Sequence, residues 1–411
     1  MKVVVVGSGG REHALATVLG RDAEVVVTPG NPAIPGSVPT PVEELVAAGD
    51  VDLVVFGPEQ PLVAGRADRL RAGGARVFGP GADGAQLEGS KAYMKLIAEE
   101  AKLPTAAWRS FTSDEVSQAV DYLATVQPPY VVKTDGLAAG KGVLVTDSLA
   151  DAAADVRGKL EGDRFGAAGQ QIVIEEGLVG PEISVFAVCD GQRAVCLPAA
   201  QDFKRVGDGD AGPNTGGMGA WSPVPLVPEG FEDEVNRVFI EPTLAELRQR
   251  GIDFRGCLYA GFILTADGPK LLEYNVRFGD PDSQVVLLRM TSSLTELLIA
   301  AADGDLTKVP APTFDDTAAV LVVAASEGYP VNPRTGDAIE GIDDARAVEG
   351  VTVLAAGVGE RDGALTTAGG RVLNVVGIGD DVADARSRAY EAIGHIRWPG
   401  EHHRTDIAAQ G

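Results

Sequence analysis

Four short apolar runs in the first hundred positions constrain the fold most strongly. Each run is continuously apolar, as expected for a parallel strand that is buried on both faces of its sheet. The runs are Val3–Val6, Val25–Val27, Leu53–Phe56 and Val77–Phe78. The segments between them have helical character and cover Glu12–Leu19, Pro41–Ala48 and Pro61–Ala72. This alternation predicts an N-terminal α/β domain with a doubly wound parallel sheet.

A different rhythm begins near Ser90, where the strands become longer. Two apolar runs flank the turn Ala266-Asp267-Gly268, which predicts a hairpin. A helix is expected over Ser283–Ala302, and the proline-rich segment Lys308–Pro312 predicts a domain boundary. The last part of the chain has the pattern of a small α+β unit. The predicted domains are residues 1–100, 101–307 with a subdomain at about 113–176, and 313–411.

Composition and charge exclude several classes of partner. The 411-residue chain has a formal net charge of −24, and nucleic-acid binding needs a basic face, so no nucleic acid is expected. The longest apolar run, Ala318–Ala325, is far shorter than the roughly 20 residues that span a bilayer, so no membrane is expected. Cys189, Cys196 and Cys257 have no metal or redox spacing and indicate a cytoplasmic protein. The sequence does not define the oligomeric state, and a monomer is favoured.

A glycine-rich turn, Gly7-Ser8-Gly9-Gly10, directly follows the first apolar run. Glycines at a strand-to-helix turn let backbone N–H groups approach an anion. A dinucleotide site would need glycine at position 12, where this chain has Glu12, and an acidic residue after the second strand, where it has Thr28–Asn31. The turn therefore favours another anion, with a purely structural turn as the alternative.

A lysine ends the apolar run Val131-Val132-Lys133, and a loop with three glycines and Lys141 follows. A buried ammonium is costly unless it is paired, and phosphate oxygens would supply such a partner. The loop could fold over phosphates as a flap, although it lacks the Walker pattern. The alternative is a flexible hairpin with solvated lysines. The co-occurrence of Lys133, Lys141 and the glycines favours a nucleotide.

Polar residues alternate along the second hairpin strand. Glu273, Asn275 and Arg277 should point to the same face because side chains on a strand alternate. Carboxylate and carboxamide oxygens suit Mg²⁺, and Arg277 could bind an oxyanion. A solvated polar face with a Glu–Arg ion pair is the alternative. The apolar neighbours Leu271, Leu272 and Val276 favour a functional row.

A fourth motif, Gln201–Val206 followed by Gly212–Ala220, combines polar side chains with glycines. Alone it would pass equally well as a surface loop. In this order, however, the four motifs together resemble the glycinamide ribonucleotide synthetase family of ATP-grasp ligases. The resemblance extends through Phe56–Gly65, Phe78–Lys91 and Leu258–Met290, and to the C-terminal marks at 369–373 and 404–407. Phe203 departs from the family, which commonly has histidine there.

The resemblance implies a fold and a reaction. The fold would place a central ATP-grasp domain with a small flap subdomain between the N-terminal sheet and the C-terminal α+β domain. Glycine's carboxylate would attack the γ-phosphate of ATP to form glycyl phosphate. The amine of 5-phosphoribosylamine would then displace phosphate and give glycinamide ribonucleotide, a step of purine synthesis. ATP and either Mg²⁺ or Mn²⁺ would be required.

The resemblance also implies roles for individual residues around ATP. Lys91 and Lys133 would hold the α- and β-phosphates, and Lys133 would also act in catalysis. Glu273 and Asn275 would bind the metal, while Arg277 would steady the transferring phosphoryl group and contact substrate. The flap over the phosphates would include Gly136, Gly140, Lys141 and Gly142. The adenine hinge and the ribose contact would come from Glu175, Glu176, Leu178 and Glu182.

The acceptor substrates would lie on the other side of the γ-phosphate. Gly9 and Gly10 would lie near the phosphoribosyl end. Asp202 and Lys204 would lie near glycine and the amine, with Asp202 also acting in catalysis. The rest of this contact would come from Asn214, Thr215, Gly216 and Gly217.

Three rival interpretations stay open from the sequence alone. An ATP-grasp ligase with a different acceptor amine would keep the same nucleotide residues. A regulatory nucleotide-binding protein without catalysis is disfavoured by the intact row at Glu273, Asn275 and Arg277. A nicotinamide dehydrogenase is disfavoured by Glu12 and by the missing acidic residue after the second strand.

Overall fold

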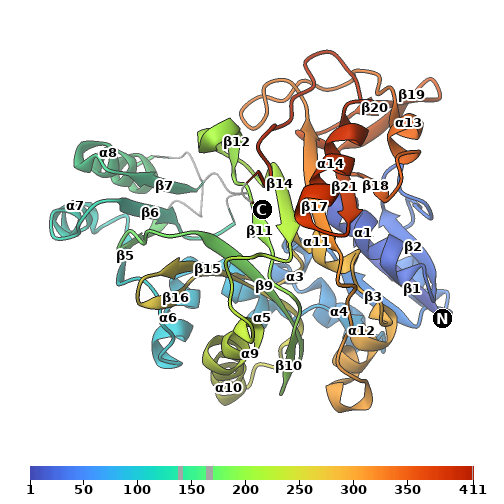
Figure 1. Ribbon diagram of the computed structural model, residues 1–411. Coiled ribbons are helices and arrows are strands. Elements are labelled where there is room, and N and C mark those ends of the chain that lie inside the picture. Colours follow the sequence, from blue (N-terminus) through green and yellow to red (C-terminus); the bar gives the residue numbers. More distant parts are fainter. Residues whose placement is uncertain (138–141, 163–169, 410) are drawn as a thin grey trace.

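The computed structural model describes residues 1–137, 142–162, 170–409 and 411. Its N-terminal sheet is parallel, with the strand order β2-β1-β3-β4 (Figure 1). The strands are β1 (Lys2–Gly7), β2 (Glu24–Pro29), β3 (Leu53–Phe56) and β4 (Val77–Phe78). The helices of this part are α1 (Gly10–Leu19), α2 (Val42–Ala47), α3 (Gln60–Val63), α4 (Arg66–Ala72), α5 (Ala82–Gly89) and α6 (Lys91–Glu100). The predicted doubly wound N-terminal domain is confirmed.

One predicted helix of this domain is interrupted. The segment expected to be continuous over Pro61–Ala72 forms α3 and α4 instead. Gly65 lies between them with a φ of 70°, in the left-handed region that side chains other than glycine rarely adopt. The break at Gly65 changes the direction of the chain between α3 and α4, so the two short helices do not form one continuous helix.

A lobe projects from the body of the molecule on the left of Figure 1. It is an antiparallel sheet with the order β5-β8-β6-β7. Its elements are β5 (Trp108–Thr112), α7 (Val116–Leu123), β6 (Tyr130–Thr134), β7 (Val143–Thr146), α8 (Leu149–Leu160) and β8 (Gln171–Glu175). The lobe has its own hydrophobic core, in which Phe111, Val132 and Ile174 are completely or almost completely buried. This separate core allows the lobe to be a distinct unit of the central region.

A second antiparallel sheet, with the order β10-β9-β15-β16, forms the floor below the lobe. Its strands are β9 (Glu182–Asp190), β10 (Ala194–Cys196), β15 (Arg255–Thr265) and β16 (Gly268–Asn275). Its helical elements are α9 (Phe231–Val235), the π-helix η3 (Asn236–Ile240), α10 (Glu241–Gln249), α11 (Asp282–Leu287), α12 (Leu294–Asp303) and the 3₁₀ turn η4 (Leu306–Lys308). The predicted β15–β16 hairpin is present, but the helix expected over Ser283–Ala302 is divided into α11 and α12. Ser293 caps α12 by accepting a hydrogen bond from Glu296 N.

The C-terminal sheet has the order β11-β14-β17-β21-β18 and includes two strands from the central region. Its strands are β11 (Gln201–Asp202), β14 (Gly219–Ser222), β17 (Ala318–Ala325), β18 (Val351–Ala355) and β21 (Arg371–Gly379). The remaining elements are β12 (Arg205–Gly207), the 3₁₀ turn η2 (Asp208–Asp210), β13 (Ala211–Asn214), α13 (Ile342–Arg346), β19 (Val358–Arg361), β20 (Ala364–Thr367) and α14 (Val382–Ile393). The two ends of the segment that carries the fourth motif, β11 and β14, are therefore built into the C-terminal sheet, while β12 and β13 pair with each other.

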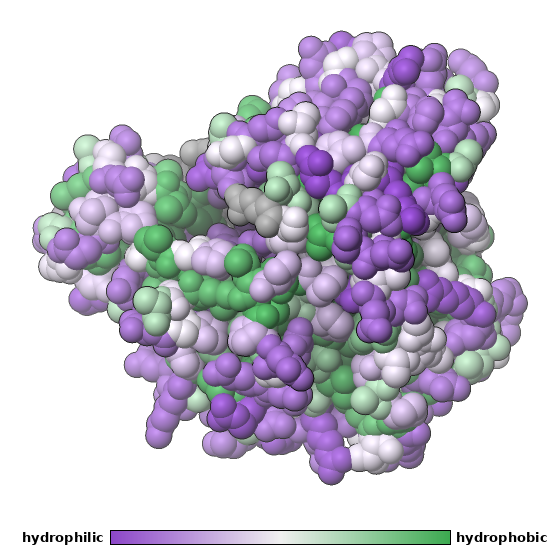
Figure 2. All heavy atoms as spheres, in the orientation of Figure 1, coloured by the Kyte–Doolittle hydropathy of each residue, from purple (hydrophilic) through white to green (hydrophobic). Residues whose placement is uncertain are grey.

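Figure 2 shows that the face seen in Figure 1 is mostly hydrophilic and is hollowed between the lobe and the C-terminal part. Within the described ranges, every helix is too short or too polar to cross a bilayer.

Candidate active site

The lysine that ends β6 is buried and paired. Lys133 is 2% exposed, and its Nζ lies 2.8 Å from Glu175 Oε1 on the neighbouring strand β8. The other oxygen of Glu175 lies 2.9 Å from Lys95 Nζ on α6. Lys133 also donates to Leu272 O of β16 at 3.3 Å. The predicted pairing of this lysine is thus met inside the protein by Glu175, while its position beside β16 brings it to the polar row.

Lys91 reaches the same place from the first turn of α6. Its Nζ donates to Glu273 Oε2 at 3.0 Å. Ser90 caps the helix, and Asp135 Oδ1 accepts hydrogen bonds from Ser90 Oγ and from Ala92 N. Asp135 begins the glycine-rich loop, so these contacts anchor the base of the loop to α6.

The row on β16 is assembled as the alternation of side chains predicts. Asn275 Nδ2 donates to Glu273 Oε1 at 3.3 Å, and an Arg277 amino group donates to Asn275 Oδ1 at 3.5 Å. Arg277 has its ion pairs elsewhere, at 2.9 Å from Glu88 and 3.5 Å from Glu59. The alternative of a Glu273–Arg277 ion pair on a solvated face is therefore not what the structure contains.

The Glu273 carboxylate is held in its ionised form. Burial alone would raise its pKa, but the ammonium groups of Lys91, Lys133 and Lys204 outweigh burial and keep the pKa well below its usual range. The described residues contain no group of three or more His, Cys, Asp or Glu side chains arranged to hold a metal. The available donors are one carboxylate and one carboxamide oxygen. That set fits Mg²⁺, which takes few protein ligands and completes its shell with phosphates and water.

A second charged cluster joins Glu182 to the fourth motif. Lys204 Nζ lies 2.8 Å from Glu182 Oε2 and 2.9 Å from Asp202 Oδ1. Burial opposes the charge on Lys204, but Asp202 and Glu182 outweigh it and raise its pKa. Burial and the Asp202 carboxylate raise the pKa of Asp282 to about 6. Asp282 ends the motif after Arg277, and the sequence predicts no role for it, because no local pattern places it near the Asp202 carboxylate.

The glycine-rich end of the fourth motif is held by Arg371. This side chain donates to Gly216 O and to Asp280 O, and it lies 2.7 Å from Asp280 Oδ2. Thr215 N donates to Lys204 O at 2.7 Å, and Gly217 N donates to Thr215 Oγ1 at 2.9 Å. Arg371 belongs to a C-terminal sequence mark, but only the fold shows that it joins β21 to this segment.

The N-terminal glycine-rich turn lies close to Asp280 and to strand β21. A Cβ placed on Gly9 would lie 3.9 Å from Asp280 Oδ2, and one on Gly10 would lie 2.1 Å from Asn374 Nδ2. The Glu12 carboxylate occupies the turn itself, because Gly9 N donates to Glu12 Oε2 at 2.6 Å. The residue that breaks the dinucleotide pattern thus fills the turn with the chain's own anion.

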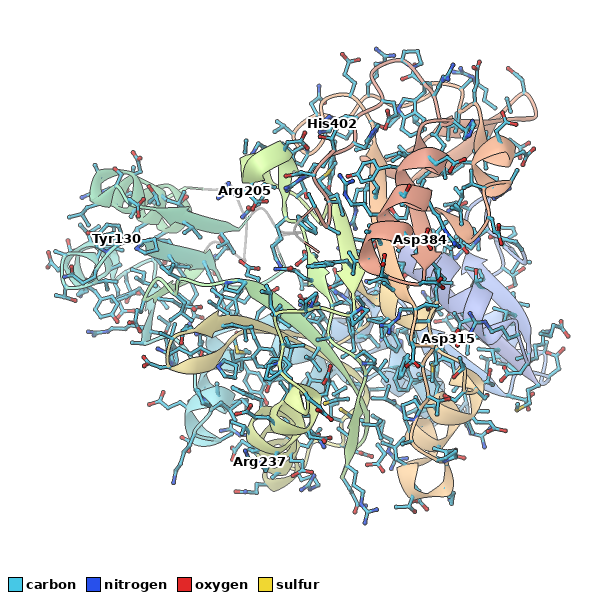
Figure 3. All side chains as sticks on the ribbon, in the orientation of Figure 1. Tyr130, Arg205, Arg237, Asp315, Asp384 and His402 are labelled. Carbon is cyan, nitrogen blue, oxygen red and sulfur yellow. The ribbon has the colours of Figure 1, made fainter. Side chains whose placement is uncertain are left out.

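The C-terminal tail packs on the hairpin β12–β13. The Arg404 side chain is buried, forms ion pairs with Asp210 and Asp406, and lies over the ring of Phe203 at 5.1 Å. His402 Nε2 lies 2.8 Å from Val206 O, and Figure 3 labels His402 and the neighbouring Arg205 where the tail meets the hairpin. Phe203, the departure from the family pattern, therefore supplies a ring face for Arg404.

The flap and the hinge are described in part. Gly136 has a φ of 111°, and Thr134 N donates to Gly142 O at 2.8 Å, which closes the base of the loop. Gly140 and Lys141 lie outside the described residues. At the hinge, Glu176 N donates to Ala107 O at 2.8 Å, and Leu178 follows at the exit from the lobe. Of the predicted nucleotide and metal residues, the structure brings Lys91, Lys133, Glu175, Glu273 and Asn275 together.

Comparison with known families identifies the chain. The N domain of phosphoribosylglycinamide synthetase matches residues 1–88, its ATP-grasp (A) domain matches 89–283, and its C domain matches 319–410. The chain belongs to the phosphoribosylglycinamide synthetase family. This result confirms the family, the ligase class and the ATP-grasp architecture that the sequence predicts.

Relatives match over essentially the whole chain. The phosphoribosylamine–glycine ligase of Leifsonia xyli is 47% identical over 100% of both chains, and that of Brucella melitensis is 45% identical over 99% of this chain and 97% of its own. The crystal structure of the Thermotoga maritima phosphoribosylamine–glycine ligase superposes with a TM-score of 0.87 at 35% identity, covering 99% of this chain and 100% of that one. Family membership therefore covers all three domains of a phosphoribosylglycinamide synthetase.

Proposed function

We propose that this chain joins glycine to 5-phosphoribosylamine, with ATP converted to ADP and phosphate, and so forms glycinamide ribonucleotide in purine biosynthesis. The observation that carries the proposal is the convergence of Lys91, Lys133 and Glu273 from α6, β6 and β16. Two ammonium groups beside an ionised carboxylate form a site for a triphosphate and a divalent cation. Membership of a ligase family supplies the reaction class.

The nucleotide would lie between the lobe and the central sheet. Lys91 and Lys133 would hold the α- and β-phosphates, and the loop 135–142 would cover them. The hinge at Glu176 and Leu178 would face the adenine, and Glu182 would contact the ribose. The Glu175 carboxylate is directed at Lys95 and Lys133, so it would act on the phosphate side of the hinge.

Glu273 and Asn275 would hold Mg²⁺ or Mn²⁺, with Glu273 supplying the negative charge. The bound ion would neutralise charge on the phosphates during transfer. Lys91 pairs with Glu273 at 3.0 Å, so it is already placed beside this site and the phosphates. Glu88 and Glu59 orient Arg277, which would steady the γ-phosphoryl group.

The reaction needs two displacements. A glycine carboxylate oxygen bonds to the γ-phosphorus while the bond to ADP breaks, and the amine nitrogen then bonds to the acyl carbon while phosphate leaves. Such transfers depend on positioning and charge neutralisation. Asp202 and Lys204 would contact glycine and the amine. Burial raises the pKa of Asp202, which suits a carboxylate that accepts the proton lost by the attacking amine.

The phosphoribosyl group would lie along the edge formed by three segments. These are the N-terminal turn at Gly9 and Gly10, the Asp280–Arg371 pair and the segment Asn214–Gly217.

The domain limits that we propose are residues 1–100, 101–307 and 313–411, with the flap subdomain at about 113–176. A monomer stays a prediction, which light scattering of the purified protein would test.

The test is release of ADP in the presence of glycine and freshly generated phosphoribosylamine, with each substrate omitted in turn. Mass spectrometry of the product should show one new amide between the two substrates. ADP release no higher than in the omission controls would refute the proposal. ADP release with glycine and a different amine would instead indicate a ligase with another acceptor.

A further inference from the structure

Lys95 is a buried lysine to which the proposed reaction assigns no role. It lies on α6 one turn after Lys91, and its side chain is 0% exposed. Its Nζ lies 2.9 Å from Glu175 Oε2 and donates to Thr105 Oγ1 at 2.8 Å. Thr105 Oγ1 in turn donates to Leu271 O on β16 at 2.6 Å. Lys95 therefore connects the lobe and the central sheet at the place where the proposed phosphate ligands meet.

Glu175 is shared between two lysines. Its Oε1 lies 2.8 Å from Lys133 Nζ, its Oε2 faces Lys95, and its side chain is 2% exposed. Within the described part of the chain, Lys133 has no other carboxylate at ion-pair distance. A phosphate that recruits Lys133 must therefore compete with Glu175 for the same ammonium group.

The charges around Glu175 leave one positive charge in excess. Together with the adjacent pair Lys91–Glu273, the cluster contains three ammonium groups and two carboxylates. Burial lowers the pKa of Lys95 to about 8, against the opposing effect of Glu175, so Lys95 is still mostly charged at neutral pH. The excess charge is available to an anion only while Lys95 neutralises Glu175.

Loss of Lys95 would change this balance. Among the described residues, Lys133 would become the only ion-pair partner of the buried Glu175 carboxylate, and moving it toward a phosphate would leave that carboxylate unpaired. An unpaired buried carboxylate is strongly unfavourable. Lys133 would then remain on Glu175 instead of binding the phosphate.

We propose that Lys95 is a positioning residue that neutralises Glu175 and thereby frees the Lys133 ammonium to bind the phosphates of ATP. The proposal rests on the phosphate-binding role proposed for Lys133. It adds a residue that acts through Glu175 without touching the nucleotide.

The test is a double-mutant cycle on Lys95 and Glu175. Calorimetric titration with a non-hydrolysable ATP analogue and Mg²⁺ gives the dissociation constant of each variant. We expect Lys95→Met to weaken binding by about tenfold or more, because Lys133 stays on Glu175. Measured against Glu175→Gln alone, the added Lys95→Met change should alter the dissociation constant by no more than about threefold, since a neutral residue 175 no longer retains Lys133. In turnover, Lys95→Met should raise KM for ATP more than KM for glycine.

A matched control separates charge from packing. Thr105→Val removes the hydrogen bond of Lys95 but keeps every charge, and it should bind the analogue within about threefold of wild type. Binding by Lys95→Met within about threefold of wild type would overturn the proposal, as would a double variant that binds more than about tenfold more weakly than Glu175→Gln alone. If Lys95→Met does not fold, the double variant is compared with Glu175→Gln alone, and a further loss above about tenfold overturns the proposal. The titration needs neither glycine nor amine, so a failure of the ligase assay on wild type is seen separately.

Discussion

Acidification should weaken the contact between the N-terminal and C-terminal sheets through His13. This residue lies on α1, is 6% exposed, and its Nδ1 accepts a hydrogen bond from Ala355 N on β18 at 2.8 Å. Burial, and to a smaller extent the charge of Arg346, lowers the pKa of His13 from 6.5 to about 4. His13 is therefore neutral in the folded protein at pH values where an unfolded chain would bind a proton.

The sign and size of the effect follow from linkage. Because the folded-state pKa lies below the unfolded value, the His13 contribution is fully present above pH 6.5 and is lost as pH falls toward 4. The full difference between the two pKa values corresponds to about 3 kcal/mol, at about 1.4 kcal/mol per pKa unit. At pH 5 the loss is already about 2 kcal/mol, since the unfolded chain is then almost fully protonated at this position.

His13→Asn is the informative variant, since a carboxamide oxygen can accept the same hydrogen bond but does not titrate. Chains with several domains need not unfold in one step, so the readout is hydrogen exchange of the α1 amides at pH 7.5 and pH 5. After correction for intrinsic exchange rates, wild type should lose about 2 kcal/mol more protection than the variant between these pH values. Equal losses in the two proteins would refute the assignment of His13 as a buried neutral group.

Four further outcomes are expected. Glu273→Gln should lower turnover by well over tenfold because the metal loses its charged ligand, and normal turnover with an unchanged Mg²⁺ dependence would contradict that role. Lys133→Ala should raise KM for ATP more than KM for glycine, whereas equal changes would indicate a general structural defect. Gly57→Ala would place a Cβ 1.9 Å from Glu12 Oε1, so we expect the free energy of unfolding to fall by roughly 1–3 kcal/mol. Gly158→Ala lies inside α8, and a Cβ at this position would have nothing within 4 Å, so the free energy of unfolding should rise by roughly 0.5–1 kcal/mol. Thermal melts in which Gly57→Ala is more stable than Gly158→Ala would count against the packing at Glu12.

The sequence predicts those parts of the site that depend on local pattern. Alternation along one strand is sufficient to place Glu273 and Asn275 on one face, and a lysine that ends an apolar run indicates a buried, paired ammonium. The contact between Lys91 and Glu273 joins residues 182 positions apart, so it depends on how α6 packs against β16. From the sequence, Lys91 receives its place near the phosphates only through the family resemblance, and its contact with Glu273 is not predicted.

Other features have no local signal. A bulge in the β15–β16 ladder, where Gly261 pairs with Glu273 and Phe262 with Leu271, leaves Leu272 as an extra residue whose carbonyl accepts from Lys133. The sequence shows that Glu12 breaks a dinucleotide pattern, but the position of its carboxylate depends on the close approach of Gly57. The sequence predicts no role for Lys95, because a lysine within an amphipathic helix is normally solvated.

The strand β17 shows why the C-terminal domain should resist isolation. All eight of its side chains, Ala318–Ala325, are buried, and it lies between β21 and β14. A fragment beginning at Lys308–Pro312 would keep β17 but lose β14 and β11, and so would present an apolar strand with unpaired backbone groups at an open edge. Such edges recruit other chains and cause aggregation. Fragment complementation with residues 201–222 should therefore be required to keep the truncated polypeptide dispersed.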